Sequence, residues 1–499
     1  MKSPLNENFL EEGLAKLEAD RTWSPRVVSR LESFIRSSDD YALYYVNPVK
    51  WAREKGISET EAIDLLLHAT FHGLFQFHWQ LMCPCCGDRV RNFKTLKALD
   101  SRFYCNFCQL ETNAALDDFI EVSFSIAPAV KQISFHYPEK LPIDDYCFRF
   151  RLHPGAQLPG YGVYTDLMKG HVRGMDYIAA GEKRTFEMDL PAGWVATHDF
   201  LNGAGFGSAI AGEKDAKTRV INVTFNGKAF SAFPAALCPG KFAITVENQS
   251  SSPMAFVLLF FTEAIPTDRL EFEPYLSGKQ LLTTQTYHGL FRSDISPEME
   301  GIGVKDITIV FTDLKSSTAM YDRVGDFKAF SLVRQHFHHL DGAINDHNGV
   351  LVKTIGDAIM AAYPSPEKAL KSAVAMIREI GKFNQTLGGG EEIRLKVGLH
   401  RGHSIVVSLN DRLDYFGQTV NVAARVQGLA DADEIYLTEE IFSVPAVQEY
   451  LAEFEVSSQF ARLKGVKDEC KVYHFKPLLQ AASAMPSTAK KNLRKKSAG

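Results

Sequence analysis

The stretch that most constrains the fold of this chain is 351–363, which reads apolar, then charged, then apolar again. Two runs rich in β-forming residues, Gly349–Thr354 and Ala358–Tyr363, flank an Ile-Gly-Asp turn whose glycine permits a sharp reversal, so the pattern predicts a β-hairpin. Lys353 and Asp357 lie four residues apart within it. Because buried charge is unfavourable unless it is paired or bound to metal, the hairpin is either a turn with two solvated charges or part of a charged site.

A second stretch favours the charged site. Asp306–Asp313 reads as a buried strand that ends on a carboxylate, and the small polar residues of Leu314–Thr318 lead from it into a long helical pattern. A strand that feeds a helix N-terminus in this way offers outward-pointing backbone N–H groups to an anion. Asp313 and Asp357 together could hold two divalent cations over a polyphosphate, because Mg²⁺ is usually held by one or two carboxylates and the phosphates themselves.

Three segments resemble the catalytic domain of class III nucleotidyl cyclases. They are Phe-Thr-Asp-Leu-Lys-Ser-Ser-Thr at 311–318, Lys-Thr-Ile-Gly-Asp at 353–357 and Asp-Tyr-Phe-Gly-Gln-Thr-Val-Asn-Val-Ala-Ala-Arg at 414–425. The match runs from about Val304 to Pro477, roughly a third of the chain. The resemblance implies an α+β sandwich with a ferredoxin-like core. The implied reaction is attack of a ribose 3′-oxygen on the α-phosphate, with pyrophosphate leaving.

The resemblance also assigns roles to residues. Asp313 and Asp357 would hold two Mg²⁺ or Mn²⁺ ions, which can clamp the attacking and leaving oxygens. Asn421 would position the ribose and Arg425 would meet the phosphate; they are one helical turn apart if this segment is helical. The backbone of Leu314–Thr318, including Thr318, would cradle the β- and γ-phosphates. Lys464 would grip the terminal phosphates, although Lys-Gly-Val-Lys departs from the family's pattern and leaves Lys467 as a rival.

The choice of base depends on two residues. Adenine presents an acceptor at N1 and a donor at N6, and Lys353 can donate to the first while Asp414 can accept from the second. Guanine presents the reverse pattern, and the cyclases that use GTP usually carry Glu and Cys or Ser at these places. We therefore expect an adenylate cyclase that converts ATP to 3′,5′-cyclic AMP. The alternatives are a cyclase that uses GTP and a zinc-containing binding or regulatory protein with a quiescent cyclase domain.

In this family each active site lies across a dimer interface. The metal carboxylates come from one copy, and the other copy supplies the residues matching Lys353, Asp414, Asn421, Arg425 and Lys464. Because one chain holds the complete set, we expect a homodimer with two equivalent sites.

Four cysteines form a second strong pattern. Cys83 and Cys86 are followed after eighteen residues by Cys105 and Cys108, a spacing typical of a four-thiolate zinc site, with Cys85 left over. Such a closed site is structural rather than catalytic. The alternative is a set of unligated or redox-active cysteines.

Composition argues for a cytoplasmic protein. The 499 residues carry a formal net charge of −5, which gives no general attraction to nucleic acid or to an anionic membrane. The longest purely apolar run, Ala255–Phe261, is far too short to span a bilayer, and the N-terminus has no apolar signal core. Clustered cysteines fit a reducing compartment better than a disulfide scaffold.

Length and pattern predict a multidomain α+β chain. Residues 1–80 are expected to be helical, with Ser58–Glu61 as a capping box; they could form a winged-helix-like unit, but a helical packing module is favoured because no Lys/Arg stripe accompanies them. A zinc ribbon at 81–116 and a β-sandwich at 117–280, acting as sensor or scaffold, come next. The sandwich is expected to include strands at Ile120–Ile126, Tyr146–Leu152, Val220–Phe225 and Phe242–Val246.

The remaining boundaries complete this scheme. A linker at 281–303, expected to begin with one short helix, would carry any regulatory change to the catalytic domain at 304–478, and a disordered basic tail occupies 479–499. Within the catalytic domain the expected order is strand, long helix, hairpin, helix and strand, with the long helix marked by Phe330, Val333, Phe337, Leu340 and Ile344.

Overall fold

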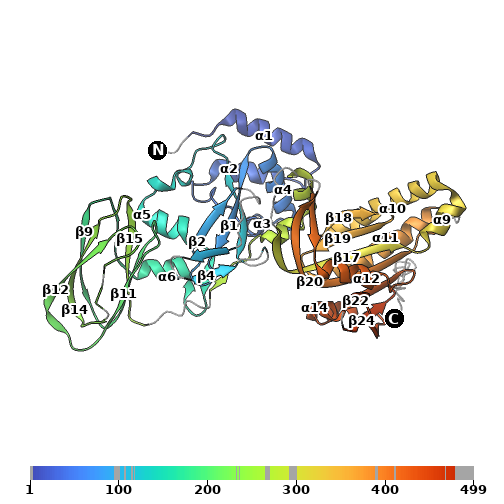
Figure 1. The fold of residues 1–499 in the computed structure, drawn as a ribbon. Coiled ribbons are helices and arrows are strands. Elements are labelled where there is room, and N and C mark those ends of the chain that lie inside the picture. Colours follow the sequence, from blue (N-terminus) through green and yellow to red (C-terminus); the bar gives the residue numbers. More distant parts are fainter. Residues whose placement is uncertain are drawn as a thin grey trace, which may run out of the picture. The chain divides into compact units, whose positions relative to one another are not determined.

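The computed structural model describes most residues of the chain. These are 4–94, 102–105, 108, 110–113, 116, 119–231, 233–234, 236–263, 270–291, 301–387, 392–409, 412–466 and 468–477. The chain, whose elements are labelled in Figure 1, divides into two compact units by its internal contacts. The first comprises 1–307 and 402–418, and the second comprises 308–401 and 419–499. None of the described helices has the length and apolar character needed to cross a membrane.

The first unit begins with four helices, α1 (Glu7–Asp20), α2 (Val27–Ser37), α3 (Pro48–Lys55) and α4 (Glu59–Phe71). The hydroxyl of Ser58 caps α4 by accepting a hydrogen bond from the amide of Glu61. The Glu61 carboxylate instead accepts a hydrogen bond from the amide of Ser24 (3.1 Å). The predicted helix start is therefore confirmed, while the glutamate of the expected capping box ties α4 to the loop before α2.

A three-stranded sheet follows the helices, in the order β2 (Arg89–Phe93), β1 (Phe75–Met82) and β5 (Ile120–Ile126). The assignment of 75–79 to a helical segment is therefore wrong, and the boundary predicted at residue 80 falls inside β1. The alternating order Phe75-Gln-Phe-His-Trp79 suits a strand, and β1 is antiparallel to β5 with Phe77 opposite Phe124. β5 is a strand as predicted, but it pairs with β1 rather than joining the later sheets.

The prediction of a strand at Tyr146–Leu152 is also wrong. The short helix α5 (Ile143–Asp145) continues directly into a π-helix, Tyr146–Arg151. Three consecutive side chains, Tyr146, Cys147 and Phe148, are buried, whereas a half-buried strand would bury every second one. Arg151 anchors the segment through two hydrogen bonds to the carboxylate of Asp88 (3.0 and 2.7 Å).

Two stacked sheets lie where the sequence predicts a β-sandwich. One has five strands in the order β13 (Ala236–Leu237), β11 (Gly207–Ile210), β10 (Gly193–Asp199), β15 (Met254–Phe261), β8 (Val172–Ile178), and the other has three in the order β12 (Asp215–Phe225), β14 (Gly240–Asn248), β9 (Lys183–Leu190). Residues of both sheets share one apolar core, which includes Val246 and Phe256. The predicted strands 220–225 and 242–246 lie within β12 and β14.

Small elements complete the first unit. They are the hairpin of β3 (Arg102–Cys105) and β4 (Leu110–Asn113), the sheet of β6 (Ala156–Leu158), β7 (Gly162–Val163) and β16 (Glu271–Phe272), and helix α6 (Tyr164–Gly170). The linker contains two short helices, α7 (Gly278–Leu282) and α8 (Gln285–Leu290), instead of the single one predicted. Tyr287 of α8 is fully buried against Trp79 of β1 (ring centroids 6.3 Å apart).

The C-terminal region contains an eight-stranded sheet. Seven strands follow the order β18 (Val350–Ile355), β19 (Ala358–Tyr363), β17 (Ile302–Leu314), β20 (Leu395–Leu409), β22 (Glu434–Thr438), β24 (Cys470–Phe475), β23 (Ser457–Ala461), while β21 (Arg412–Phe416) pairs with β20. The predicted order of strand, helix, hairpin, helix and strand is confirmed for β17 to β20. β23 and β24 were not predicted.

The helices of the second unit are α9 (Ser317–Val324), α10 (Asp326–Asp346), α11 (Pro366–Thr386), α12 (Gln418–Gln427), α13 (Glu439–Phe442) and α14 (Pro445–Leu451). α10 and α11 run side by side (Figure 1) and contribute to the main core of this unit. Gly325, with φ +77°, separates α9 from α10 in the region predicted as one long helix. The buried face of α10 includes Val333, Leu340 and Ile344, but Phe330 is 63% exposed, which corrects its place in the predicted apolar stripe.

Candidate active site

The hairpin of β18 and β19 places Asp357 at a turn. Ile355 pairs with Ala358 across the two strands, and Gly356 between them has φ +63°, a conformation that favours glycine. The Asp357 side chain is half-buried, and its Oδ2 atom is shielded from solvent and has no hydrogen-bond partner among the described residues. A shielded carboxylate oxygen without a donor is unfavourable unless a cation approaches it.

Asp313 lies beside this turn because β17 is the neighbour of β19. Thr312 pairs with Ile359, so the end of β17 lies next to the turn that carries Asp357. Burial and the charge of Asp357 raise the pKa of Asp313, while Lys396 of β20 acts in the opposite direction. The Lys396 ammonium is 3.7 Å from Oδ2 of Asp313. The two carboxylates therefore repel each other, and one lysine partly offsets that repulsion.

This pair suits a hard divalent cation. Two carboxylates lie at neighbouring strand ends; one of them has a raised pKa, and the other has an oxygen without a hydrogen-bond partner among the described residues. Binding of a divalent cation would relieve the repulsion and satisfy the orphaned oxygen. The residues thus fit the Mg²⁺ or Mn²⁺ ions expected from the sequence.

A pocket of about 610 Å³ opens beside Asp357. The first residues of α9 form one wall, including the exposed Thr318, and α10 forms another; the lining residues are Ser317, Thr318, Tyr321, Phe330, Val333, Arg334, Phe337, Gly356 and Asp357. α9 begins after Ser316, whose φ of +59° turns the chain from β17 into the helix. The helix N-terminus predicted as the phosphate cradle therefore lies next to one of the two carboxylates.

Arg425 and the turn that carries Lys464 come together in the second unit. A methyl group on Gly465 would lie 3.4 Å from Nη2 of Arg425, so the guanidinium lies against this turn. Asn421 and Arg425 both lie on α12, one turn apart as predicted, and Asn421 is exposed. Lys464 is exposed as well, whereas its rival Lys467 lies outside the described residues.

The two predicted base-reading residues lie in different units. Lys353 is half-buried on β18, in the second unit. Asp414 lies on β21, in the first unit, is 5% exposed, and accepts a hydrogen bond from the backbone amide of Tyr415 (2.8 Å).

Two residues near the carboxylates were not predicted. Lys396 read as an ordinary strand residue, and its only sequence signal is the alternation that puts Arg394 and Lys396 on one face. His336 of α10 is fully buried, and burial lowers its pKa to about 4 although the charge of Asp357 opposes the shift. It is therefore neutral near pH 7, and a buried histidine within a helical pattern carries no sequence signal of its position.

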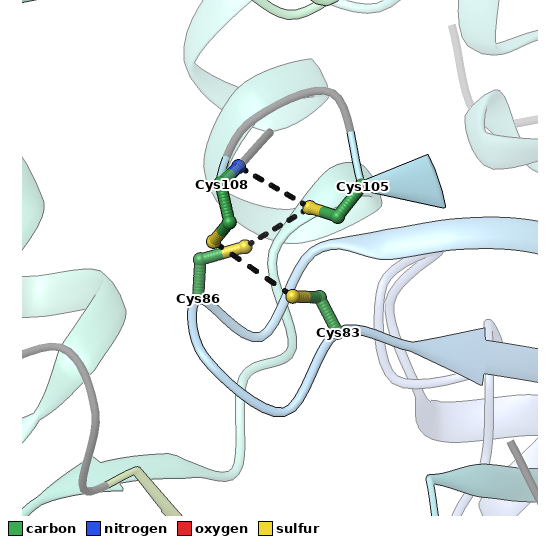
Figure 2. Close-up of side chains that lie close together, drawn as sticks. All are labelled: Cys83, Cys86, Cys105 and Cys108. Atoms are coloured by element: carbon green, nitrogen blue, oxygen red, sulfur yellow. Dashed lines mark hydrogen bonds between the residues drawn. The ribbon is translucent and has the colours of Figure 1, made fainter. Parts of the chain in front are cut away.

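The four predicted zinc ligands converge in the first unit (Figure 2). The sulfur of Cys83 is 3.8 Å from that of Cys108, and the sulfur of Cys86 is 3.6 Å from that of Cys105. Sulfurs at the corners of a tetrahedron around Zn²⁺, with Zn–S bonds of about 2.3 Å, would be about 3.8 Å apart. No disulfide joins them, so the cluster could hold zinc. Cys85 is not part of the cluster.

Comparison with known proteins gives two family matches, one to the N-terminal part of the chain and one to the C-terminal part. Residues 12–289 match the model of a family of unknown function, DUF5939, and residues 301–477 match the adenylate and guanylate cyclase catalytic domain. An adenylate cyclase of Anabaena cylindrica is 26% identical over 193 residues, covering 36% of this chain and 38% of that protein. A receptor-type guanylate cyclase of Caenorhabditis elegans is 25% identical over 163 residues, covering 30% of this chain and 15% of that protein. The chain thus spans well under half the length of these relatives.

Among solved structures, the adenylyl cyclase CyaB from P. aeruginosa is 20% identical to this chain, with a TM-score of 0.30, and covers 35% of this chain and 95% of its own.

Proposed function

We propose an adenylate cyclase activity for this chain, which belongs to the DUF5939 family over residues 12–289 and carries an adenylate and guanylate cyclase catalytic domain at residues 301–477. The observation that carries the proposal is the Asp313–Asp357 pair beside the α9 pocket, together with Lys353 and Asp414 as the two residues that suit adenine. The related proteins include both adenylate and guanylate cyclases, so the choice of ATP rests on those two side chains.

The reaction joins the ribose 3′-oxygen to the α-phosphorus and breaks the bond from that phosphorus to the bridging oxygen of pyrophosphate. Divalent cations held by Asp313 and Asp357 would supply a positive charge at the attacking and leaving oxygens. Arg425, steadied against the Gly465 turn, offers donors to the charge that develops on the phosphoryl group, and Asn421 orients the ribose from the same helix. Thr318 and Lys464 bind the terminal phosphates.

We further propose that two copies of the chain complete each site, as the full set of residues in one chain implies. Exposed apolar side chains in the second unit support an interface between copies. Phe327 is 95% exposed and Phe330 is 63% exposed, and Phe330 also borders the pocket at Asp357. A partner surface that covers these rings would lie beside the carboxylates.

Regulation by the DUF5939 region is the third part of the proposal, with zinc at the four cysteines as a structural element. Helix α7 contacts β17 and β21 through residues of the first unit. The Lys279 ammonium donates to the carbonyl of Asp306 on β17 (3.0 Å), and the Tyr415 hydroxyl on β21 donates to the carbonyl of Leu282 (3.3 Å). A shift of α7 would therefore move β17 and β21, which carry Asp313 and Asp414.

Product analysis tests the activity. Purified full-length protein is incubated with ATP or GTP and with Mg²⁺ or Mn²⁺, and the products are separated by chromatography. We expect cyclic AMP from ATP, lost in Asp313→Ala. The double variant Lys353→Glu with Asp414→Cys should shift activity from ATP toward GTP, because its side chains present the opposite hydrogen-bonding pattern. Cyclic GMP from the unmodified protein would overturn the assignment of ATP, and no product from either nucleotide would favour a binding protein with a quiescent cyclase domain.

A further inference from the structure

A cluster of two histidines and one aspartate lies in the first unit and shares no residue with the cysteine cluster or with the candidate cyclase site. His68 and His72 are one turn apart on α4, and Asp20 is the last residue of α1. Oδ2 of Asp20 is 2.6 Å from Nδ1 of His68 and 2.7 Å from Nε2 of His72. Three potential ligand atoms from two helices therefore converge on one point.

The chemistry of this cluster differs from that of the cysteine site. Two imidazoles and a carboxylate suit first-row divalent ions such as Zn²⁺, and three protein ligands leave a coordination position for water. The side chains are 14%, 12% and 25% exposed for His68, His72 and Asp20, so an ion can reach them from solvent. The carboxylate oxygen and the two imidazole nitrogens all lie within reach of one ion.

The two imidazoles are also held in place by neighbouring rings. The indole of Trp23 meets the His68 ring edge to face (centroids 5.4 Å apart, 89° between planes), and Phe71 contacts the His72 ring (5.4 Å, 72°). His68 approaches with Nδ1 and His72 with Nε2, which is how side chains one turn apart reach a common point. Ligands around a tetrahedral Zn²⁺ lie about 3.3 Å apart, so an ion would need the donors to open by roughly 0.6 Å.

We propose that Asp20, His68 and His72 form a binding site for a divalent transition-metal ion of the zinc type, separate from the cysteine cluster and independent of the proposed cyclase activity. A purely structural hydrogen-bonded network is the competing explanation. It predicts that the three side chains stabilise the contact between α1 and α4 but add no metal to the protein.

The site is connected to the linker helix α8. Arg21, next to Asp20, pairs with the carboxylate of Asp64 on α4 (3.0 Å), and the same carboxylate accepts a hydrogen bond from the hydroxyl of Thr286 on α8 (2.7 Å). Because Asp20 and Arg21 are adjacent, an ion that repositions Asp20 also repositions the group that holds Asp64. Binding of a metal ion would therefore alter the contact between Asp64 and α8.

Counting zinc in the full-length protein tests the proposal. The protein is equilibrated with Zn²⁺ in excess Mg²⁺, which occupies sites that prefer hard cations, freed of unbound metal, and analysed for zinc per chain. The double variant His68→Gln with His72→Gln should carry one zinc fewer than the unmodified protein, whatever the cysteine cluster holds. The matched control His338→Gln removes an exposed histidine of α10 and should not change the count.

A second variant tests the proposal even if the double variant does not fold. Asp20→Asn retains an oxygen that accepts hydrogen bonds but lacks the charge, and its affinity for Zn²⁺ at this site, measured by calorimetry, should fall at least roughly tenfold. Equal zinc counts in the unmodified protein and in the folded double variant would overturn the proposal. If the double variant does not fold, an unchanged zinc affinity in Asp20→Asn would overturn it instead. A matching loss in His338→Gln would assign the extra zinc to surface histidines and would also overturn it.

Discussion

At the scale of single residues, the site is governed by the repulsion between Asp313 and Asp357. Because the pKa of Asp313 is raised, its proton is held to a higher pH in the folded chain than in the unfolded one. This protonation favours the folded state at low pH, and the benefit is lost as the pH rises through the raised pKa. A divalent cation acts in the opposite direction, since it binds the ionised carboxylates.

This balance predicts the pH dependence of metal binding. Mn²⁺ affinity should fall as the pH drops through the raised pKa of Asp313, because the ion must then displace a proton. Lys396→Met removes the cation that lowers this pKa, so its loss of affinity should begin at a higher pH. Titration with Mn²⁺ at several pH values, followed by electron paramagnetic resonance, measures these affinities. Lys382→Met, which removes an exposed lysine paired with Glu379, should behave like the unmodified protein, and superimposable curves for all three proteins would rule the mechanism out.

A second prediction at this scale concerns Gly465. In Gly465→Ala the new methyl group would be 3.4 Å from Arg425, on a residue with φ +77°. A shift of the guanidinium by a fraction of an ångström should lower kcat by roughly tenfold to a hundredfold. Gly56→Ala is the matched control, since Gly56 has φ +61° but no atom within 4 Å of the added methyl group. Steady-state kinetics and thermal unfolding separate the effects: equal losses of activity in both variants would mean that backbone strain alone is responsible.

At the scale of elements, the cysteine cluster joins the turn that follows β1 to the end of β3. Gly87, with φ +66°, closes the first turn by donating its amide hydrogen to the carbonyl of Cys83 (3.0 Å), and the second pair begins at Cys105, the last residue of strand β3. A metal shared by both turns would contribute directly to the stability of this region.

The corresponding prediction uses the spare cysteine as its control. Cys83→Ser should abolish zinc binding at the cluster and lower the free energy of unfolding by about 3 kcal/mol or more. Cys85→Ser removes a thiol outside the cluster and should retain both zinc and stability. Zinc analysis together with denaturant unfolding provides the measurement. Equal zinc content in the two variants would contradict a four-cysteine site.

At the scale of the whole molecule, the arrangement of active sites across two copies is testable by complementation. Asp357→Ala and Arg425→Ala should each be inactive alone. When the two variants are produced together, half of the randomly formed dimers contain one chain of each variant. One of the two sites in such a dimer is intact, so activity should return to about a quarter of the unmodified level. A mixture of Asp357→Ala with Asp313→Ala should remain inactive, because every site then lacks a carboxylate. Failure of the first mixture, with both proteins dimeric, would place each site within one chain.

The sequence by itself determined the local structure around the candidate site residues. The glycine turn between β18 and β19, the strand that ends near Asp313, the spacing of Asn421 and Arg425 on one helix and the two cysteine pairs are all predicted correctly in structure. Each depends on residues within a few positions of one another, so backbone preferences and side-chain spacing suffice. The strand at 75–79 and the π-helix at 146–151 were missed because short apolar segments take their conformation from what they pack against.

The tertiary structure alone decided the contacts between distant segments. Lys396 lies beside Asp313, Arg425 lies against Gly465, and Asp20 meets His68 and His72, although these partners are separated by about 40 to 80 residues of chain. No local preference encodes such a meeting, since it follows from strand order in the sheet and from the packing of one helix on another. The sequence therefore specifies which chemical groups are present and how each is locally held, while the fold determines which charges and donors act on one another.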